Sequence, residues 1–361
     1  MDNNLSRIKI KGFKSIKALD LEMKPINVLI GANGSGKSNF ISVFKLLDVL
    51  YQKKLQTYIS TNGKAERFLH FGSQITQEII IDLSLSDANT YFLKLAKDVD
   101  NDSFVIDIDN AAFTVYRKTH DVSYSSLESN ISNETSSGII ENSKNYLQQC
   151  KLYHFHDTSE KAKFKSNQDI KDNDFLWSDA GNLAPFLLRL SQDYPEDYQN
   201  IVSAIQTVAS YFHDFSFKKD SKDVLLRWQH KNNLEGVGFS ANNLSDGTAR
   251  FICMATLFLQ PKELRPATIV LDEPEIGLHP VALTVLSEII KAVSNDGSQV
   301  IISTQSVTLA NCFKPDDFIV VDYVDGVSSF RRLKEQELDV WLEEYQMGDI
   351  WNKGLLGGRP W

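Results

Sequence analysis

The sequence predicts an α/β fold in which a mixed, mainly parallel sheet is combined with a β-rich N-terminal lobe and an inserted helical lobe. Hydrophobic residues 26–30 predict a strand that leads into a glycine-rich turn and then into apolar residues at helical spacing. Strand-like and helical segments alternate again from residue 251 to residue 322, which is typical of a parallel sheet. Between these parts, residues 79–116 predict short antiparallel strands, and residues 181–212 predict two helices that separate near Pro195.

These segments divide the chain into four parts. Residues 1–118 hold the glycine-rich turn and the short strands, and residues 241–335 hold the second series of strands and helices. Residues 119–240 combine the helical lobe with a mobile excursion at 119–144, because that stretch is rich in Ser, Asn and Glu and has no stable period. Residues 336–361 form an aromatic tail.

Composition indicates a folded protein of a reducing compartment. The chain has 361 residues, of which 42% are hydrophobic and 24% charged, as in globular proteins. Cys150, Cys253 and Cys312 are far apart and odd in number, so they predict neither disulfides nor a zinc site. The N-terminus has no signal-peptide pattern, and no apolar run approaches the roughly 20 residues of a membrane span. We therefore expect a cytoplasmic protein, and the net charge of -9 argues against, without excluding, a nucleic-acid-binding surface.

The segment GANGSGKS at residues 31–38 matches the phosphate-loop pattern G-x-x-x-x-G-K-[ST] at every fixed position. Its glycines let backbone N–H groups surround phosphates, Lys37 neutralises the β and γ oxygens, and Ser38 binds Mg²⁺. The strand before it and the helix after it argue against a chance glycine turn. The residues predicted to bind the nucleotide here are Gly31, Asn33, Gly34, Ser35, Gly36, Lys37, Ser38 and Asn39.

The segment TIVLDEPEIGLHP at residues 268–280 is an apolar strand that ends in two acids. Asp272 is predicted to reach the same Mg²⁺ through Ser38 and its water shell, and Glu273 to polarise an attacking water. The alternative is a pair of acids that cap the following helix.

The segment NLSDGTARF at residues 243–251 predicts a second phosphate-binding helix end, in which Ser245 and the backbone of Gly247 supply donors. The guanine-reading pattern NKxD is missing from the sequence. One nucleotide has little need for two such helix ends from one lobe, although an ordinary N-capped helix would also explain the segment.

Together these motifs resemble the ABC-type ATPases of the SMC/RecF group, and more closely the stand-alone bacterial ATPases of the AAA-15/AAA-21 and OLD-like set. The resemblance covers most of the chain and extends to IKIKGFKSI, YHFHDTS, GNLAPFLLRL, STQS and the C-terminal WLEEYQMGDIWNKGLLGGRPW. It implies an ABC-type ATPase head, with ATP and Mg²⁺ as cofactors, that forms a homodimer or higher oligomer around two sandwiched ATP molecules. It also implies that Ser245 and Gly247 act on the ATP of the second subunit and that Glu273 is the catalytic carboxylate.

Gln305, in STQS, departs from the histidine that is usual in transporter-like relatives. A glutamine can orient water or contact the γ-phosphate but does not titrate near neutral pH, so we expect slow hydrolysis in which ATP acts as a clamp. The resemblance suggests that Lys14 and Ser15 approach the nucleotide, although a solvated turn is an equal alternative. The glutamine of a glutamine loop is either Gln74 or Gln77, and the sequence favours neither.

Two further segments each have two possible interpretations. His154, His156 and Asp157 suggest either a metal site or, as we prefer, a buried hydrogen-bonded strand. The tail carries Trp341, Tyr345, Trp351 and Trp361, which either pack on the head or dock a partner.

The function that fits best is an ATPase that regulates or scaffolds a separate nuclease or toxin in bacterial anti-phage defence. No nuclease domain follows the ATPase motifs, so we expect the effector on another polypeptide. The alternative is a RecF-like DNA repair ATPase, for which the lysine-rich residues 9–17 and 160–171 would have to line a basic groove. A membrane transporter subunit is disfavoured because the histidine switch is missing.

Overall fold

The computed structural model describes residues 4–85, 88–98, 100–113, 118–134, 138–219, 222–236 and 238–358. The chain forms two compact units. The first unit consists of Met1–Leu152, Pro266–Asp272 and Gly297–Trp361, and the second of Tyr153–Arg265 and Glu273–Asp296.

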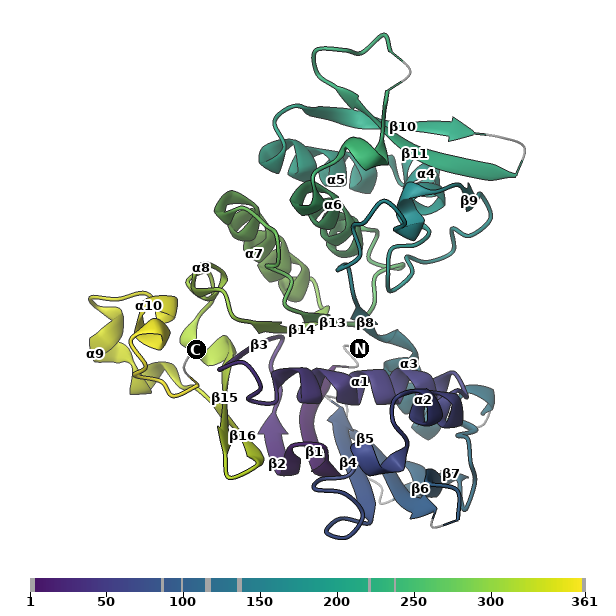
Figure 1. Cartoon of the computed structure of the whole chain (residues 1–361), viewed down its shortest axis with the longest axis vertical. Coiled ribbons are helices and arrows are strands. Elements are labelled where there is room, and N and C mark those ends of the chain that lie inside the picture. Colours follow the sequence, from purple (N-terminus) through teal and green to yellow (C-terminus); the bar gives the residue numbers. More distant parts are fainter. Residues whose placement is uncertain are drawn as a thin grey trace. The chain divides into compact units, whose positions relative to one another are not determined.

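The first unit contains a six-stranded sheet whose strands follow the order β16-β15-β3-β14-β13-β8 (Figure 1). Four of them are mutually parallel, as the βα alternation of the sequence predicted. Strand β14 is fully buried and β3 almost so, which is typical of parallel sheets. The strands are β3 (Ile26–Ile30), β8 (Cys150–Tyr153), β13 (Thr268–Asp272), β14 (Gln299–Thr304), β15 (Phe318–Val324) and β16 (Val327–Arg332), of which β15 and β16 form an antiparallel hairpin.

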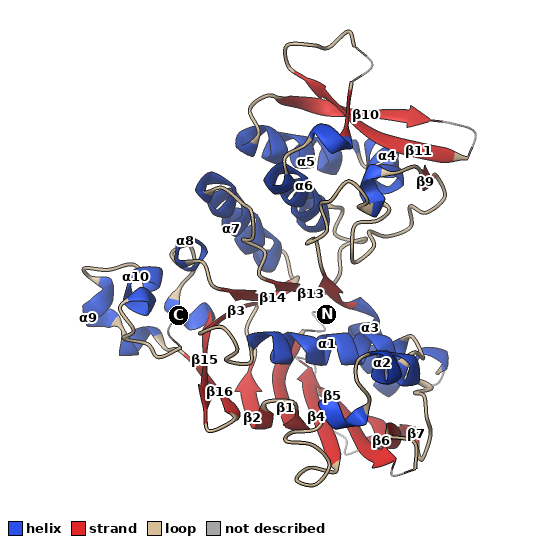
Figure 2. Ribbon diagram, viewed as in Figure 1, coloured by secondary structure: helices blue, strands red, loops and turns tan. Residues whose placement is uncertain are grey.

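A second six-stranded sheet of the first unit is antiparallel and follows the order β2-β1-β4-β5-β6-β7. Its strands are β1 (Leu5–Phe13), β2 (Ile16–Glu22), β4 (Glu78–Leu85), β5 (Asn89–Asp98), β6 (Ser103–Phe113) and β7 (Lys118–Ser123). Buried and half-buried residues alternate along β4, so one face of the sheet is apolar. Figure 2 shows the helices α1 (Lys37–Tyr51), α2 (Leu55–Thr61) and α3 (Gly138–Gln149) beside this sheet, and one core contains residues of α1 and of both sheets.

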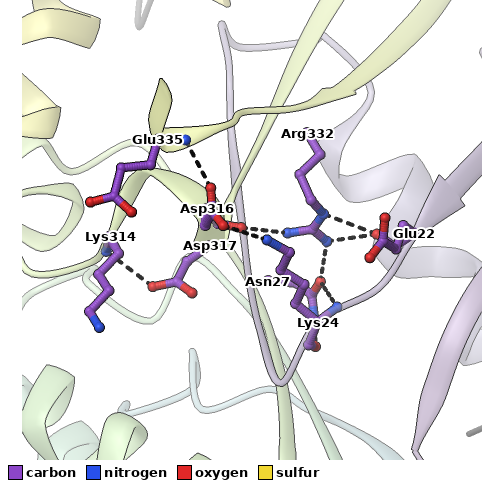
Figure 3. A network of polar contacts seen from close by, with 8 residues as sticks. All are labelled: Glu22, Lys24, Asn27, Lys314, Asp316, Asp317, Arg332 and Glu335. Atoms are coloured by element: carbon purple, nitrogen blue, oxygen red, sulfur yellow. Dashed lines mark hydrogen bonds and ion pairs between the residues drawn. The ribbon is translucent and has the colours of Figure 1, made fainter. Parts of the chain in front are cut away.

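A polar network ties the two sheets of the first unit together at the ends of β2 and β16 (Figure 3). Arg332 donates to the carbonyl oxygen of Glu22 from Nε (3.0 Å) and Nη2 (2.8 Å), to that of Asp316 (3.1 Å), and to the side chain of Asn27. Burial lowers the pKa of this guanidinium to about 10. At the other end of β16, Ser328 donates its backbone N–H to the carbonyl oxygen of Ser15 (2.8 Å), so β16 is fastened to β2 at both ends.

The second unit combines four helices with a small antiparallel sheet of order β10-β11-β12, to which β9 adds on β11. Its helices are α4 (Leu183–Asp193), α5 (Pro195–Val208), α6 (Asp246–Leu259) and α7 (Pro280–Asn295). Its strands are β9 (Gln168–Asp169), β10 (Phe212–Lys219), β11 (Asp223–His230) and β12 (Phe239–Ser240). The break between α4 and α5 falls at Pro195, which occupies the first turn of α5, as predicted.

Residues 119–144 differ from the prediction. Strand β7 begins at Lys118, and α3 covers the last part of the stretch, so most of its described residues have regular structure that the sequence did not predict. The predicted mobility of the stretch stays a prediction. Val122, Ile131 and Ile140 are buried, whereas Tyr124 and Leu127 are exposed, and the apolar side chains are too irregularly spaced to give a periodic signal. Residues 114–117 and 135–137 lie outside the described residues.

Three short helices complete the first unit: α8 (Val307–Ala310), α9 (Asp339–Leu342) and α10 (Met347–Asn352). Among the helices of the described residues, none is both long and apolar enough to cross a lipid bilayer.

Candidate nucleotide-binding site

The glycine-rich turn lies between the end of β3 and the start of α1, as predicted. Gly34 and Gly36 have φ angles of 76° and 113°, which L side chains rarely adopt, and a Cβ at Gly31 would lie 2.3 Å from the carbonyl oxygen of Val321. Lys37 is buried and donates from Nζ to the carbonyl oxygens of Gly31 (2.6 Å) and Ala32 (2.9 Å). The ammonium therefore lies inside the curl of the loop, where a phosphate-binding lysine is needed.

The turn between β1 and β2 packs against this loop. Ser15 Oγ accepts a hydrogen bond from Asn39 Nδ2 (2.7 Å) and contacts Ser328 Oγ (2.7 Å), which lies 2.6 Å from the carbonyl oxygen of Ser35. Lys14 Nζ donates to Ser42 in α1 (2.9 Å), and burial lowers the pKa of Lys14. The alternative of a solvated turn is therefore wrong, whereas contact of Lys14 and Ser15 with a nucleotide stays a prediction. No sequence signal pointed to Ser328.

Asp272 ends β13 at the same edge of the sheet. The parallel register pairs Asp272 with Ser303 of β14, and Thr304 with Ile30 of β3, so the carboxyl ends of three strands meet beside the start of the loop. Ser303 is fully buried and donates a hydrogen bond from Oγ to the Asp272 carboxylate. Gln305, half-buried, follows β14 directly. The sequence had placed Ser303 in the STQS motif without predicting its contact with Asp272.

Glu273 is the first residue after β13 and begins the part of the chain that belongs to the second unit. Its φ angle of 48° is left-handed, which costs a glutamate of order 1 kcal/mol or more and is concentrated at functional sites. The following turn is closed by the backbone N–H of Ile276, which donates to the carbonyl oxygen of Glu273 (3.3 Å). Helix α7 is capped by His279, so the alternative of two acids capping this helix is wrong.

Ser245 is the N-cap residue of α6. Its Oγ accepts a hydrogen bond from the backbone N–H of Thr248 (3.2 Å) and lies 2.8 Å from Thr248 Oγ1, which in turn lies 3.1 Å from the hydroxyl of Tyr211. Ser245 is nevertheless exposed, so its hydroxyl caps its own helix and faces solvent. A Cβ at Gly247 would lie 2.3 Å from the carbonyl oxygen of Gly277, so this glycine is required by close packing in addition to any role of its N–H.

The predicted site residues thus fall into two groups. The first unit brings together residues 31–39, Asp272 and Gln305, and the second unit holds Ser245, Gly247 and Glu273. Gln74 and Gln77 lie between the segment η1 (Ala65–Arg67) and β4, and the structure does not choose between them as a glutamine loop.

The expectation that His154 and His156 lie in a buried strand is wrong. Strand β8 ends at Tyr153, and both histidines are exposed, with ring centroids 6.2 Å apart, while the intervening Phe155 is buried. Asp157 accepts hydrogen bonds from Ser159, whose hydroxyl is the main cause of the lowered pKa of Asp157. Among the described residues, no group of three or more His, Cys, Asp or Glu side chains is arranged to hold a metal ion.

The aromatic tail packs on the first unit through Trp351, which is fully buried and donates from Nε1 to the carbonyl oxygen of Gly358. Gly358 donates its N–H to Asp322, and a Cβ at Gly358 would lie 3.2 Å from the Cα of Gly31. The tail therefore lies against the first glycine of the phosphate loop, which the sequence did not predict. Trp341 keeps 43% of its surface exposed, and Trp361 lies outside the described residues.

A phosphate loop after a buried parallel strand, an acid at the end of the strand two places along the same sheet and an adjoining antiparallel sheet define the SMC-head-like fold of ABC ATPases. The Smc head bound to the C-winged helix domain of ScpA has a TM-score of 0.56 and 15% identity over 93% of this chain and 99% of that chain. The Pyrococcus furiosus Smc head with an extended coiled coil, bound to the C-terminal domain of ScpA, has a TM-score of 0.58 and 14% identity over 94% of this chain and 98% of that chain.

The chain belongs to the AAA_21 family of P-loop ATPases, whose model matches residues 26–311 and whose description reads "AAA domain, putative AbiEii toxin, Type IV TA system". No curated protein matches the chain.

Proposed function

We propose that the protein binds ATP with Mg²⁺ at the edge formed by the phosphate loop, Asp272 and Gln305, and hydrolyses it slowly. The observation that supports this most is the parallel register, which sets the ends of β3, β13 and β14 side by side. Lys37 would bind the β and γ phosphates. The exposed hydroxyl of Ser38 and the carboxylate of Asp272 are the oxygen donors that Mg²⁺ prefers, and a site with few protein ligands suits an ion that keeps its waters and binds phosphates.

In this proposal a water attacks the γ-phosphorus, the bond between that phosphorus and the ADP oxygen breaks, and ADP and phosphate leave. Glu273 polarises the water and accepts its proton, and Lys37 balances the charge on the phosphate oxygens. Gln305 orients the water but cannot exchange a proton near neutral pH, which is our reason for expecting slow turnover.

We further propose that two copies sandwich two ATP molecules, with Ser245 and the N–H of Gly247 of each copy contacting the ATP of the other. The exposure of Ser245 at the start of a 14-residue helix supports this, because the first N–H groups of a helix attract phosphate. The family description names a putative toxin of type IV systems, and the two Smc heads are bound to ScpA domains. These names support a role in which the dimer, cytoplasmic in our proposal, regulates or scaffolds a separate nuclease or toxin in anti-phage defence.

The alternative of a RecF-like DNA clamp is less well supported by the lysines on which it depends. Lys9 and Lys11 pair with acids on β4 at 3.7 and 3.8 Å, and Lys163 pairs with Asp179 at 2.7 Å. Lys165 is buried and donates to the carbonyl oxygen of Thr158 (2.6 Å). These four lysines are partly neutralised or hidden, which weakens a phosphate-binding surface, whereas Lys17, Lys161 and Lys171 of the same stretches are exposed.

The test compares wild type with Lys37→Ala and Glu273→Gln. We expect Lys37→Ala to lose ATP binding, and Glu273→Gln to bind ATP normally, to lose hydrolysis and to accumulate as an ATP-dependent dimer in light scattering. Normal hydrolysis by either variant would overturn the proposed site. Co-purification of a nuclease or toxin encoded beside the protein would support the effector role, and ATP-dependent, salt-sensitive binding of duplex DNA without such a partner would support the clamp instead.

A further inference from the structure

Arg250 connects three segments of the second unit. It lies in α6, five residues after Ser245, and donates from Nη1 to the carbonyl oxygen of Ile276 (2.9 Å), from Nη2 to that of His156 (3.0 Å) and from Nε to that of Phe155 (3.3 Å). All three acceptors are backbone oxygens of segments far away in the sequence. A planar guanidinium with donors in a fixed fork suits this arrangement, whereas a lysine has a single charged nitrogen.

The first of these segments is the turn that begins at Glu273. Its Ile276 is held from both sides, because its N–H donates to the carbonyl oxygen of Glu273 and its own carbonyl oxygen accepts from Arg250. Glu273 has a left-handed backbone, which persists only where surrounding contacts fix it. Arg250 supplies one such contact.

The start of α6 and this turn also touch directly. A Cβ at Gly277 would lie 2.4 Å from Arg250 Nη1, and a Cβ at Gly247 would lie 2.3 Å from the carbonyl oxygen of Gly277. The two backbones approach closely at Gly247, and the guanidinium of Arg250 occupies the space beside Gly277, whose φ angle of 76° also disfavours a side chain. The turn and the first residues of α6 therefore have little freedom to shift independently.

The second segment is YHFHDTS, residues 153–159, which forms neither a metal site among the described residues nor a buried strand. Tyr153 and Phe155 are buried with ring centroids 5.8 Å apart, and the carbonyl oxygen of Thr158 accepts from the buried Lys165. The segment is thus anchored at both ends, and its middle carbonyl oxygens face Arg250. It gives the guanidinium a fixed support on the side opposite to Ile276.

We propose that Arg250 is a positioning residue that joins the start of α6, the turn from Glu273 and the YHFHDTS segment into one rigid piece. The placement of Ser245 against the nucleotide of a second copy then depends on the same contacts as the placement of Glu273. The inference rests on the proposed ATP-sandwich dimer, and it adds the contacts that couple dimer formation to hydrolysis within each chain.

The test uses Arg250→Lys in the full-length protein, with Arg189→Lys as a matched control. Arg189 also donates to backbone oxygens of the second unit, those of Asn173 (2.9 Å) and Asp174 (3.1 Å), but it lies on α4. Three quantities are measured for each variant: ATP affinity, steady-state hydrolysis, and ATP-dependent association in the Glu273→Gln background, where hydrolysis does not remove the ATP.

We expect Arg250→Lys to bind ATP within about twofold of wild type, because the phosphate loop belongs to the first unit. Hydrolysis and ATP-dependent association should both weaken by about tenfold or more, since charge-assisted hydrogen bonds are lost. Arg189→Lys should leave all three quantities near the wild-type values. A second variant, Gly277→Ala, keeps the arginine but crowds its guanidinium, and it should reproduce the two losses.

Several results would overturn the proposal. If hydrolysis were lost while ATP-dependent dimer formation stayed normal, Arg250 would position only the turn that begins at Glu273. If dimer formation alone were lost, Arg250 would position only the start of α6. Equal loss of ATP affinity together with early thermal unfolding would make Arg250 a general stability residue. Failure of the dimer proposal is a separate outcome. In that case the Glu273→Gln protein would not form a dimer in the presence of ATP even though it keeps Arg250.

Discussion

Ser303 Oγ donates a hydrogen bond to the carboxylate of Asp272 across two neighbouring parallel strands. The contact fixes one oxygen of the carboxylate at the edge of the sheet. An outer hydrogen bond of this kind orients a metal-binding carboxylate.

We therefore predict that Ser303→Ala lowers Mg²⁺-dependent hydrolysis by about tenfold and raises the Mg²⁺ concentration needed for half-maximal activity. ATP binding measured without Mg²⁺ should be unchanged. Ser287→Ala is the control, because Ser287 is equally buried but donates to the carbonyl oxygen of Thr284 (2.7 Å) within α7. An unchanged Mg²⁺ dependence in Ser303→Ala would contradict the role given to Asp272.

Substitution of Ser245 tests its predicted contact with the second copy. Ser245→Asp keeps a good helix cap, so stability should change by less than the about 1 kcal/mol that a lost cap costs, but its negative charge repels phosphate. We expect normal ATP affinity with loss of ATP-dependent association and of hydrolysis. Ser245→Arg should lose the same two properties through bulk. A variant that hydrolysed ATP normally as a monomer would contradict action between copies.

The tail contact predicts an effect of a distant tryptophan on nucleotide binding. Trp351→Phe keeps an aromatic ring but removes the hydrogen bond to Gly358, which packs against Gly31. We expect ATP affinity to fall about fivefold, as for the loss of one buried hydrogen bond. Trp341→Phe, at an exposed position, should leave the ATP affinity unchanged. Equal ATP affinities for the two variants would show that the tail contact does not affect nucleotide binding.

Cysteine reactivity follows from burial. Burial raises the pKa of both the Cys150 and the Cys253 thiol to about 12, so at neutral pH neither forms the reactive thiolate to a useful extent. Cys312 is half-exposed beside α8. Iodoacetamide labelling of the native protein, followed by mass spectrometry, should therefore modify Cys312 first. Labelling of Cys150 or Cys253 at a similar rate would show that these cores open readily.

Asp109 predicts a pH dependence of stability. It is fully buried on β6, where Tyr91 donates to it (2.7 Å), and burial raises its pKa above the ordinary 3.8. The folded state therefore binds this proton more tightly than the unfolded chain, and the contribution to the free energy of unfolding is lost as the pH rises from 3.8 through the folded pKa. Urea unfolding at several pH values should show Asp109→Asn gaining stability relative to wild type across this window. A constant difference between the two proteins would contradict the raised pKa.

The sequence predicted those parts of the site that are written in short, local patterns. The phosphate loop, the strand that ends in Asp272 and the start of α6 each combine a glycine or acid with a hydrophobic segment of fixed length, and the structure forms each of these elements. Parallel pairing of β3, β13 and β14 followed from their apolar character and from the helices between them.

The remainder depends on contacts between residues far apart in the chain. Ser328 and Gly358 approach the phosphate loop from segments whose polar or glycine-rich composition carries no period, so nothing marked them in advance. The two exposed histidines at 154 and 156 alternate as strand residues would, but β8 ends before them. Alternation in a short segment does not determine where pairing stops.

The packing of Gly358 on Gly31 also has a consequence for how the protein is made. During synthesis, residues 31–38 leave the ribosome early, whereas residue 358 is added near the end of the described chain. Contacts between such distant residues form late in folding, because a long loop must close first. The phosphate loop would therefore be made long before the neighbour that steadies it, and ATP binding at full affinity would begin only after Gly358 has packed on Gly31.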